Sequence, residues 1–181
     1  MEMRARALYR FFHKAFCLLL VGGFLSIYSF AQNDSSEYNV KAMFVLNFMK
    51  YVEWPSEPGK NTFKIGVVGE TELFNALVNM TLNKNESKKI LIGKVDQEST
   101  GNYQIIIITG KQNKKSIEWL KNYEDKGVLL ISDNSKDETI AAINLLNIDN
   151  KIRFDINHSK ARWGGVKISS KLADLAITVH P

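Results

Sequence analysis

Apolar and polar residues alternate strictly between Lys151 and Asn157. The apolar positions are Ile152, Phe154 and Ile156, and the polar positions between them include Arg153 and Asp155. Successive side chains of a strand point to opposite faces, so this pattern predicts a strand with one buried face and one face toward water. The apolar segment 143–148 predicts a second strand, and Asp149 and Asn150 predict the tight turn of a hairpin between the two.

A capped turn and a short amphipathic helix are expected after this hairpin. The side-chain oxygen of Asn157 can accept hydrogen bonds from backbone N–H groups of the turn 158–163. Gly164 and Gly165 end that turn, where a positive φ is needed. After Ser169 and Ser170, the spacing predicts a helix with an apolar stripe of Leu172, Leu175 and Ala176.

Residues 38–54 contain no Gly or Pro and are apolar on nearly every side, which predicts a helix that is buried over most of its surface. The polar segment before it, 32–37, is expected to fray. One narrow stripe of the helix, formed by Asn39, Lys50 and Glu53, is expected to face water. Lys41 lies opposite that stripe, so its ammonium group either extends out to solvent, which we expect, or pairs with a carboxylate.

The middle of the chain alternates predicted strands with predicted helices. Strands are expected at 63–69, 90–95, 103–109 and 127–133, and helices at 70–80 and 114–123. Four consecutive isoleucines, 105–108, are apolar on both faces, as in a central parallel strand covered by helices on each side. We therefore predict a single-domain α/β fold, a Rossmann-like three-layer αβα sandwich whose sheet is mostly parallel, with the antiparallel hairpin at one edge.

The first 31 residues read as a secretory signal peptide, and the mature α/β domain is expected to span residues 32–181. A positive segment precedes an apolar run, and small residues then stand at Ser29 and Ala31. We expect cleavage between Ala31 and Gln32. The alternative is a retained membrane anchor, although the apolar run is shorter than the ~20 residues that a membrane span requires.

Removal of this segment changes what charge and cysteine content imply. The whole chain has a formal net charge of +5. Four of its basic residues and one acidic residue lie in the first 31, so the mature chain carries +2, which with the export route argues against a nucleic-acid partner. The single cysteine, Cys17, also lies there, so the mature domain can form no disulfide, thiol nucleophile or thiolate metal site.

No residue constellation in the mature sequence predicts catalysis, a metal or a cofactor. The glycines at 66 and 69 match neither a dinucleotide-binding nor a P-loop spacing. Asp133 is expected at the carboxyl edge of the sheet, where it is interpreted as part of a turn. His158 and His180 have no second ligand at metal spacing, and no base is placed to activate Ser159.

Five segments carry a resemblance that covers essentially the whole mature region: VKAMFVLNFMKYVEWP (40–55), FKIGVVGETEL (63–73), GVLLISD (127–133), KIRFDIN (151–157) and VKISSKLADLA (166–176). Through them the chain resembles the YfiR/HmsC-like family of exported regulators. The resemblance implies a periplasmic α/β sandwich, often dimeric, that holds a membrane-bound diguanylate cyclase inactive. Two departures are the absence of the cysteine pairs that couple some members to redox state, and Ala141–Ala142 where the family commonly has Gly-Gly.

The resemblance and the absence of catalytic motifs together predict a non-enzymatic periplasmic regulator. Its partner is expected to be the extracytoplasmic sensor domain of a membrane-bound diguanylate cyclase, and a homodimer stays open. Tyr51 and Trp54, at the end of the predicted helix, are candidates for the partner contact, with a purely structural role as the equal alternative. The competing functions are a periplasmic small-molecule binding protein that reports to a sensor kinase or transporter and, as the weakest, a hydrolase without a recognised motif.

Overall fold

The computed structural model describes residues 28–55, 62–69, 72–82, 89–99, 101–110, 114–123, 125–133 and 140–181, with side chains from residue 36 onward. The chain divides into two compact units at residue 37. In the first unit the described residues, 28–37, are helical. The second unit, Tyr38–Pro181, contains the sheets and the helices that cover them. Residues 1–27, which make up most of the predicted signal peptide, lie outside the described part of the chain.

Helix α2 runs from Tyr28 to Phe48, so it begins before the predicted helix and ends six residues earlier. The segment 32–37, predicted to fray, is part of this helix. The predicted end at Trp54 is wrong because Val52–Glu53 forms a strand, β1, which pairs antiparallel with β8 (Lys167–Ile168) in a separate two-stranded sheet. Asn39, Lys50 and Glu53 are exposed as expected.

The main sheet has seven strands in the order β3-β2-β4-β5-β6-β7-β9. Its parallel part consists of β2 (Thr62–Val68), β3 (Lys89–Lys94), β4 (Ile105–Ile108), β5 (Leu129–Asp133) and β6 (Ile143–Ile148). The hairpin of β6 and β7 (Lys151–Asn157) is confirmed, with Leu145 opposite Phe154 and positive φ at Asp149 and Asn150. A strand that the pattern did not predict, β9 (Thr178–His180), pairs in parallel with β7 and forms the edge.

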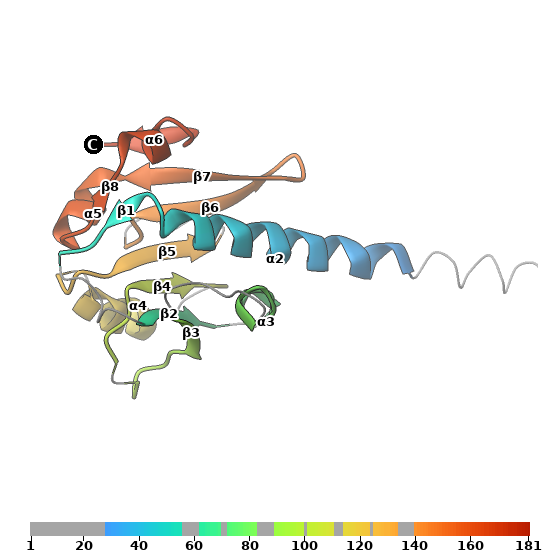
Figure 1. Ribbon diagram of the computed structural model, residues 1–181, viewed down its shortest axis with the longest axis horizontal. Helices are drawn as coiled ribbons and strands as arrows, with labels where there is room; N and C mark the ends of the chain where they lie inside the picture. The colour runs from blue at the N-terminus through green and yellow to red at the C-terminus, as the bar shows by residue number, and fades with distance from the viewer. Residues whose placement is uncertain are drawn as a thin grey trace, which may run out of the picture. The chain divides into compact units, whose positions relative to one another are not determined.

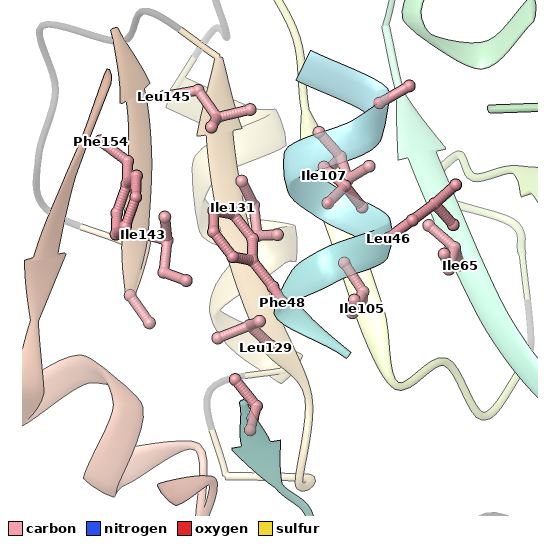
Figure 2. Close-up of a cluster of buried hydrophobic side chains, with 14 of the residues drawn as sticks. Leu46, Phe48, Ile65, Ile105, Ile107, Leu129, Ile131, Ile143, Leu145 and Phe154 are labelled. Atoms are coloured by element: carbon pink, nitrogen blue, oxygen red, sulfur yellow. The ribbon is translucent and has the colours of Figure 1, made fainter. Parts of the chain in front are cut away.

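Both faces of the sheet are covered, as the isoleucine run predicted (Figure 1). Ile105 and Ile107 pack in one core with α2 and with α3 (Glu72–Leu82), whereas Ile106 and Ile108 pack in a second core with α4 (Lys114–Leu120) and the adjoining 3₁₀ turn η1 (Lys121–Tyr123). Figure 2 shows Leu46 and Phe48 of α2 over the strand side chains of the first core. The three-layer αβα sandwich with a mostly parallel sheet is confirmed.

The C-terminal segment follows its predicted caps but not its predicted helix length. Asn157 caps α5 (His158–Trp163) by accepting from the Lys160 N–H at 3.0 Å, and φ of Gly165 is +71°. Ser169 caps α6, which covers only Ser170–Ala173, and of the expected stripe Leu172 and Ala176 contact the core whereas Leu175 does not. Leu172 is buried, but Leu175 lies past the helix end and is 64% exposed.

Candidate functional site

Three apolar side chains at the C-terminal end of the chain are exposed to solvent. Leu175, Ile177 and Val179 are 64%, 48% and 42% exposed, respectively. Ile177 and Val179 share one side of an extended segment, because the Ile177 N–H donates to the Phe154 carbonyl at 3.0 Å and Val179 lies opposite Ile156 in the ladder. We call these three residues the edge patch. Contiguous exposed apolar groups can mark a protein-interaction site.

The backbone beside the edge patch also offers hydrogen-bonding groups. Strand β9 is the last in the sheet order, and no described strand pairs with its outer side. In a parallel ladder the backbone groups of alternate residues point to opposite sides. The backbone N–H and C=O groups of Ile177 and Val179 point toward β7, so those of Thr178 and His180 point toward the open edge. An edge of this kind can accept an extended segment from another protein as an added strand.

Helix α5 lies against β9 and adds positive charge around it. The Ser159 hydroxyl donates to the Pro181 carbonyl, and Lys160 Nζ lies 4.5 Å from the ring centroid of the exposed Trp163. The helix carries two basic side chains, Lys160 and Arg162, and no acidic one. These two positive charges favour a partner surface that carries acidic residues.

Tyr51 and Trp54, the two predicted partner contacts, are partly buried against the core. The Trp54 ring packs edge-on against Phe63 with centroids 5.0 Å apart, and its Nε1–H donates to the Gln104 carbonyl at 2.9 Å. The Tyr51 carbonyl accepts from the Ser169 N–H at 2.9 Å, beside the β1–β8 pair. The structure thus gives both residues a role in the fold, and their role in partner binding stays a prediction.

A buried ion pair connects α2 to the carboxyl end of β5. Lys41 Nζ lies 2.6 Å from Asp133 Oδ1, and the two side chains are only 4% and 8% exposed. The ammonium group is also 5.1 Å from the centroid of the Tyr38 ring. The expected extension of Lys41 to solvent is wrong, and so is the reading of Asp133 as a simple turn residue, because the alternating strand directs Asp133 onto the face that α2 covers.

The described residues hold no side-chain cluster of the kind that ligates a metal ion. No cluster of three or more His, Cys, Asp or Glu side chains occurs among them. His158 begins α5 and His180 lies in β9. No described helix is long and apolar enough to cross a membrane. The edge patch, with its open strand and positive surroundings, is the strongest candidate for a functional surface in this part of the chain.

Comparison with known proteins agrees with the resemblance noted from the sequence. No curated protein matches the chain. The sequence model of the YfiR/HmsC-like family, in contrast, matches residues 38–177, which include the β2–β7 core, α5 and α6 and end at the residue just before β9. This match covers most of the chain, and the chain belongs to the YfiR/HmsC-like family, whose members are known as periplasmic regulators.

Proposed function

We propose that this protein is a non-enzymatic regulator that binds the extracytoplasmic sensor domain of a membrane-bound diguanylate cyclase and holds the cyclase inactive. The proposal is supported by family membership and, above all, by the edge patch of Leu175, Ile177 and Val179 beside an open strand edge. A protein that acts by binding alone can shift its partner only through differential affinity for the partner's two states. A difference of about 3 kcal/mol shifts that equilibrium roughly 150-fold.

The edge patch provides the kinds of contact that such a difference requires. Its apolar side chains lose water on binding, and the outward backbone groups of Thr178 and His180 can pair with a strand of the sensor domain. The positive charge of α5, from Lys160 and Arg162, speeds the approach of an acidic surface and opposes a basic one. The partner segment we propose is therefore extended, apolar on one side and acidic at its flanks.

The test is binding of the purified mature protein to purified sensor domains of the host's membrane-bound diguanylate cyclases. Ile177→Lys should abolish binding while the domain stays folded, because Ile177 is 48% exposed and its backbone pairing is retained. Met43→Lys is the matched control, since Met43 is 50% exposed on α2. Equal loss in both variants, or in neither, contradicts the assigned surface. If the wild-type protein binds none of the sensor domains, the function itself is contradicted and the small-molecule-binding alternative takes precedence.

A second copy of the chain is the competing occupant of the edge patch. The molar mass of the wild-type protein and of Ile177→Lys, measured by light scattering, distinguishes self-association from binding of a sensor domain. A dimer that becomes a monomer on this substitution assigns the patch to self-association. A wild-type monomer, or a dimer in both proteins, leaves the patch accessible to the sensor domain.

We also propose that the protein is exported to the periplasm by residues 1–31. The bond between Ala31 and Gln32 lies within α2, in a stretch of which only the backbone is described. The intact mass of the protein recovered from the periplasm decides the matter. A mass that starts at Gln32 supports export with cleavage, whereas a chain that keeps Met1 contradicts it and supports an anchor.

A further inference from the structure

A cavity of about 510 Å³ opens at the carboxyl ends of β2 and β3, on the face of the sheet that α4 covers. Small-molecule sites generally have volumes of about 300–1,000 Å³, so this cavity has room for one small organic ligand. Its described lining combines aliphatic, aromatic and carboxylate groups: Val68, Gly69, Val95, Asp96, Gln97, Glu98, Ser116 and Trp119.

The cavity lies next to the place where open α/β sheets bind ligands. Helix α3, which follows β2, packs on one face of the sheet, and α4, which follows β4, packs on the other. Strands β2 and β4 are neighbours in the sheet. The connections thus reverse direction between β2 and β4, the arrangement at whose carboxyl edge open α/β sheets bind ligands.

The floor of the cavity is rigid backbone. Thr109 joins β4 to β2, because its N–H and its hydroxyl both donate to the Val68 carbonyl, at 2.9 and 3.0 Å. Gly69 follows with φ at +95°, and a Cβ atom there would lie 2.6 Å from the Thr109 carbonyl oxygen. Glycine is therefore required at this turn, and Gly69 is one of the residues that line the cavity.

One wall is an indole ring whose orientation is fixed from behind. Trp119 of α4 packs edge-to-face on the buried Tyr123, with ring centroids 5.7 Å apart and an interplanar angle of 83°. The same Trp119 lines the cavity. An aromatic ring held in place in this way can attract a cation without losing much side-chain freedom on binding.

Two acidic residues that are exposed to solvent, Asp96 and Glu98, are also among the lining residues. The Asp96 carboxylate accepts at Oδ1 from the Ser99 hydroxyl at 2.6 Å and from the Glu98 N–H at 3.1 Å. The Ser99 hydroxyl lowers the pKa of Asp96, so this carboxylate is ionised at neutral pH. These bonds fix Oδ1 and the loop. No Lys, Arg or His is among the described lining residues.

We propose that this cavity binds a small organic cation, a primary amine or a quaternary ammonium compound, with Trp119 against its positive group and Asp96 and Glu98 as counter-charges. The lining residues Val68 and Val95 accommodate the hydrocarbon part of such a ligand. An anion such as phosphate would meet two carboxylates and no described cationic side chain. The site does not depend on the proposed repressor function, because the domain can bind the cation with or without a cyclase.

The experiment is calorimetric titration of the mature protein at low ionic strength, where exposed carboxylates are least screened. Choline and putrescine represent the two classes of amine. The matched ligand control is the uncharged carbon analogue of choline, in which carbon replaces the nitrogen. We expect at least one of the two cations to bind, and the uncharged analogue to bind about tenfold more weakly than choline if choline is the preferred ligand.

Matched variants locate the site. Asp96→Asn keeps the Oδ1 acceptor and removes the charge, and Glu98→Gln does the same at the second carboxylate. Each should weaken cation binding about three- to tenfold, and Trp119→Leu about tenfold. Glu118→Gln, on an exposed side of α4 beside Lys121, should leave it unchanged. If Trp119→Leu does not fold, Trp119→Phe, which keeps an aromatic ring, should bind within a few-fold of the wild type.

Three results would overturn this proposal. The first is that neither choline nor putrescine binds at millimolar concentration. The second is that choline is the only cation bound and its uncharged analogue binds with equal affinity. The third is that Glu118→Gln weakens cation binding as much as Glu98→Gln does. Because the titration uses no cyclase, its failure is distinguishable from failure of the repressor function.

Discussion

Loss of the buried ion pair between Lys41 and Asp133 is expected to lower the free energy of unfolding more than most single substitutions at the described charged residues. Lys41→Met removes the ammonium group from a side chain that is 4% exposed and leaves the Asp133 carboxylate, 8% exposed, without its counter-charge 2.6 Å away. Asp133→Leu removes the carboxylate instead and leaves the ammonium group of Lys41 buried. The surroundings cannot supply water in its place, because both groups are enclosed between α2 and the sheet.

The expected cost is about 3–5 kcal/mol for either single substitution, the range observed when one partner of a buried ion pair is removed. The double variant, Lys41→Met with Asp133→Leu, should cost less than either single one, because it leaves no uncompensated charge. With an m-value of about 2 kcal/mol/M, the single substitutions should lower the urea midpoint by roughly 1.5–2.5 M.

The assay is urea unfolding of the mature domain followed by circular dichroism, with the double-mutant cycle built from the four proteins. Glu118→Gln is the control, because Glu118 forms a 3.3 Å pair with Lys121 in which both side chains are largely exposed. Such a surface pair contributes about 0–1 kcal/mol. If Lys41→Met costs no more than Glu118→Gln, or if the cycle gives no coupling energy, the buried pair does not have the role assigned here.

Two further predictions concern the packing of the sheet. Phe154→Ala should cost about 3–5 kcal/mol through the cavity it leaves, whereas Arg153→Ala on the exposed face should cost under about 0.5 kcal/mol; equal losses in urea unfolding would mean a wrong register. Gly69→Ala should cost about 2 kcal/mol or more, because its φ is +95° and the new Cβ would lie 2.6 Å from the Thr109 carbonyl. Gly110→Ala, with φ at +66° and no atom within 4 Å, should cost only about 1 kcal/mol, and comparable thermal shifts for the two would contradict this difference.

Much of the sheet could be predicted from the sequence, because its signals are local. The isoleucine run, the alternation from Lys151 to Asn157 and the turn at Asp149 and Asn150 each report burial or backbone geometry within a few residues. The caps at Asn157 and Ser169 are local as well. Patterns of this kind fix which face of an element is buried, and hence the layers of the fold.

Features that depend on distant partners could not be predicted. Helix α2 ends at Phe48 because Val52 pairs with Ile168, a tertiary contact that a continuous apolar run conceals. The Lys41–Asp133 pair joins an early helix to a middle strand, and only the sheet order brings the two side chains together. The edge patch did leave a signal, since Leu175, Ile177 and Val179 alternate with smaller or polar residues, but the expected helix through Leu175 obscured it.

The central claim is that the protein represses a diguanylate cyclase by binding it, and the most direct measurement is the cellular level of cyclic-di-GMP. A host strain that lacks the gene should have a higher level than its parent. Return of the wild-type gene or of Met43→Lys should restore the low level, and Ile177→Lys should not. An unchanged level in the deletion strain would contradict the repressor function.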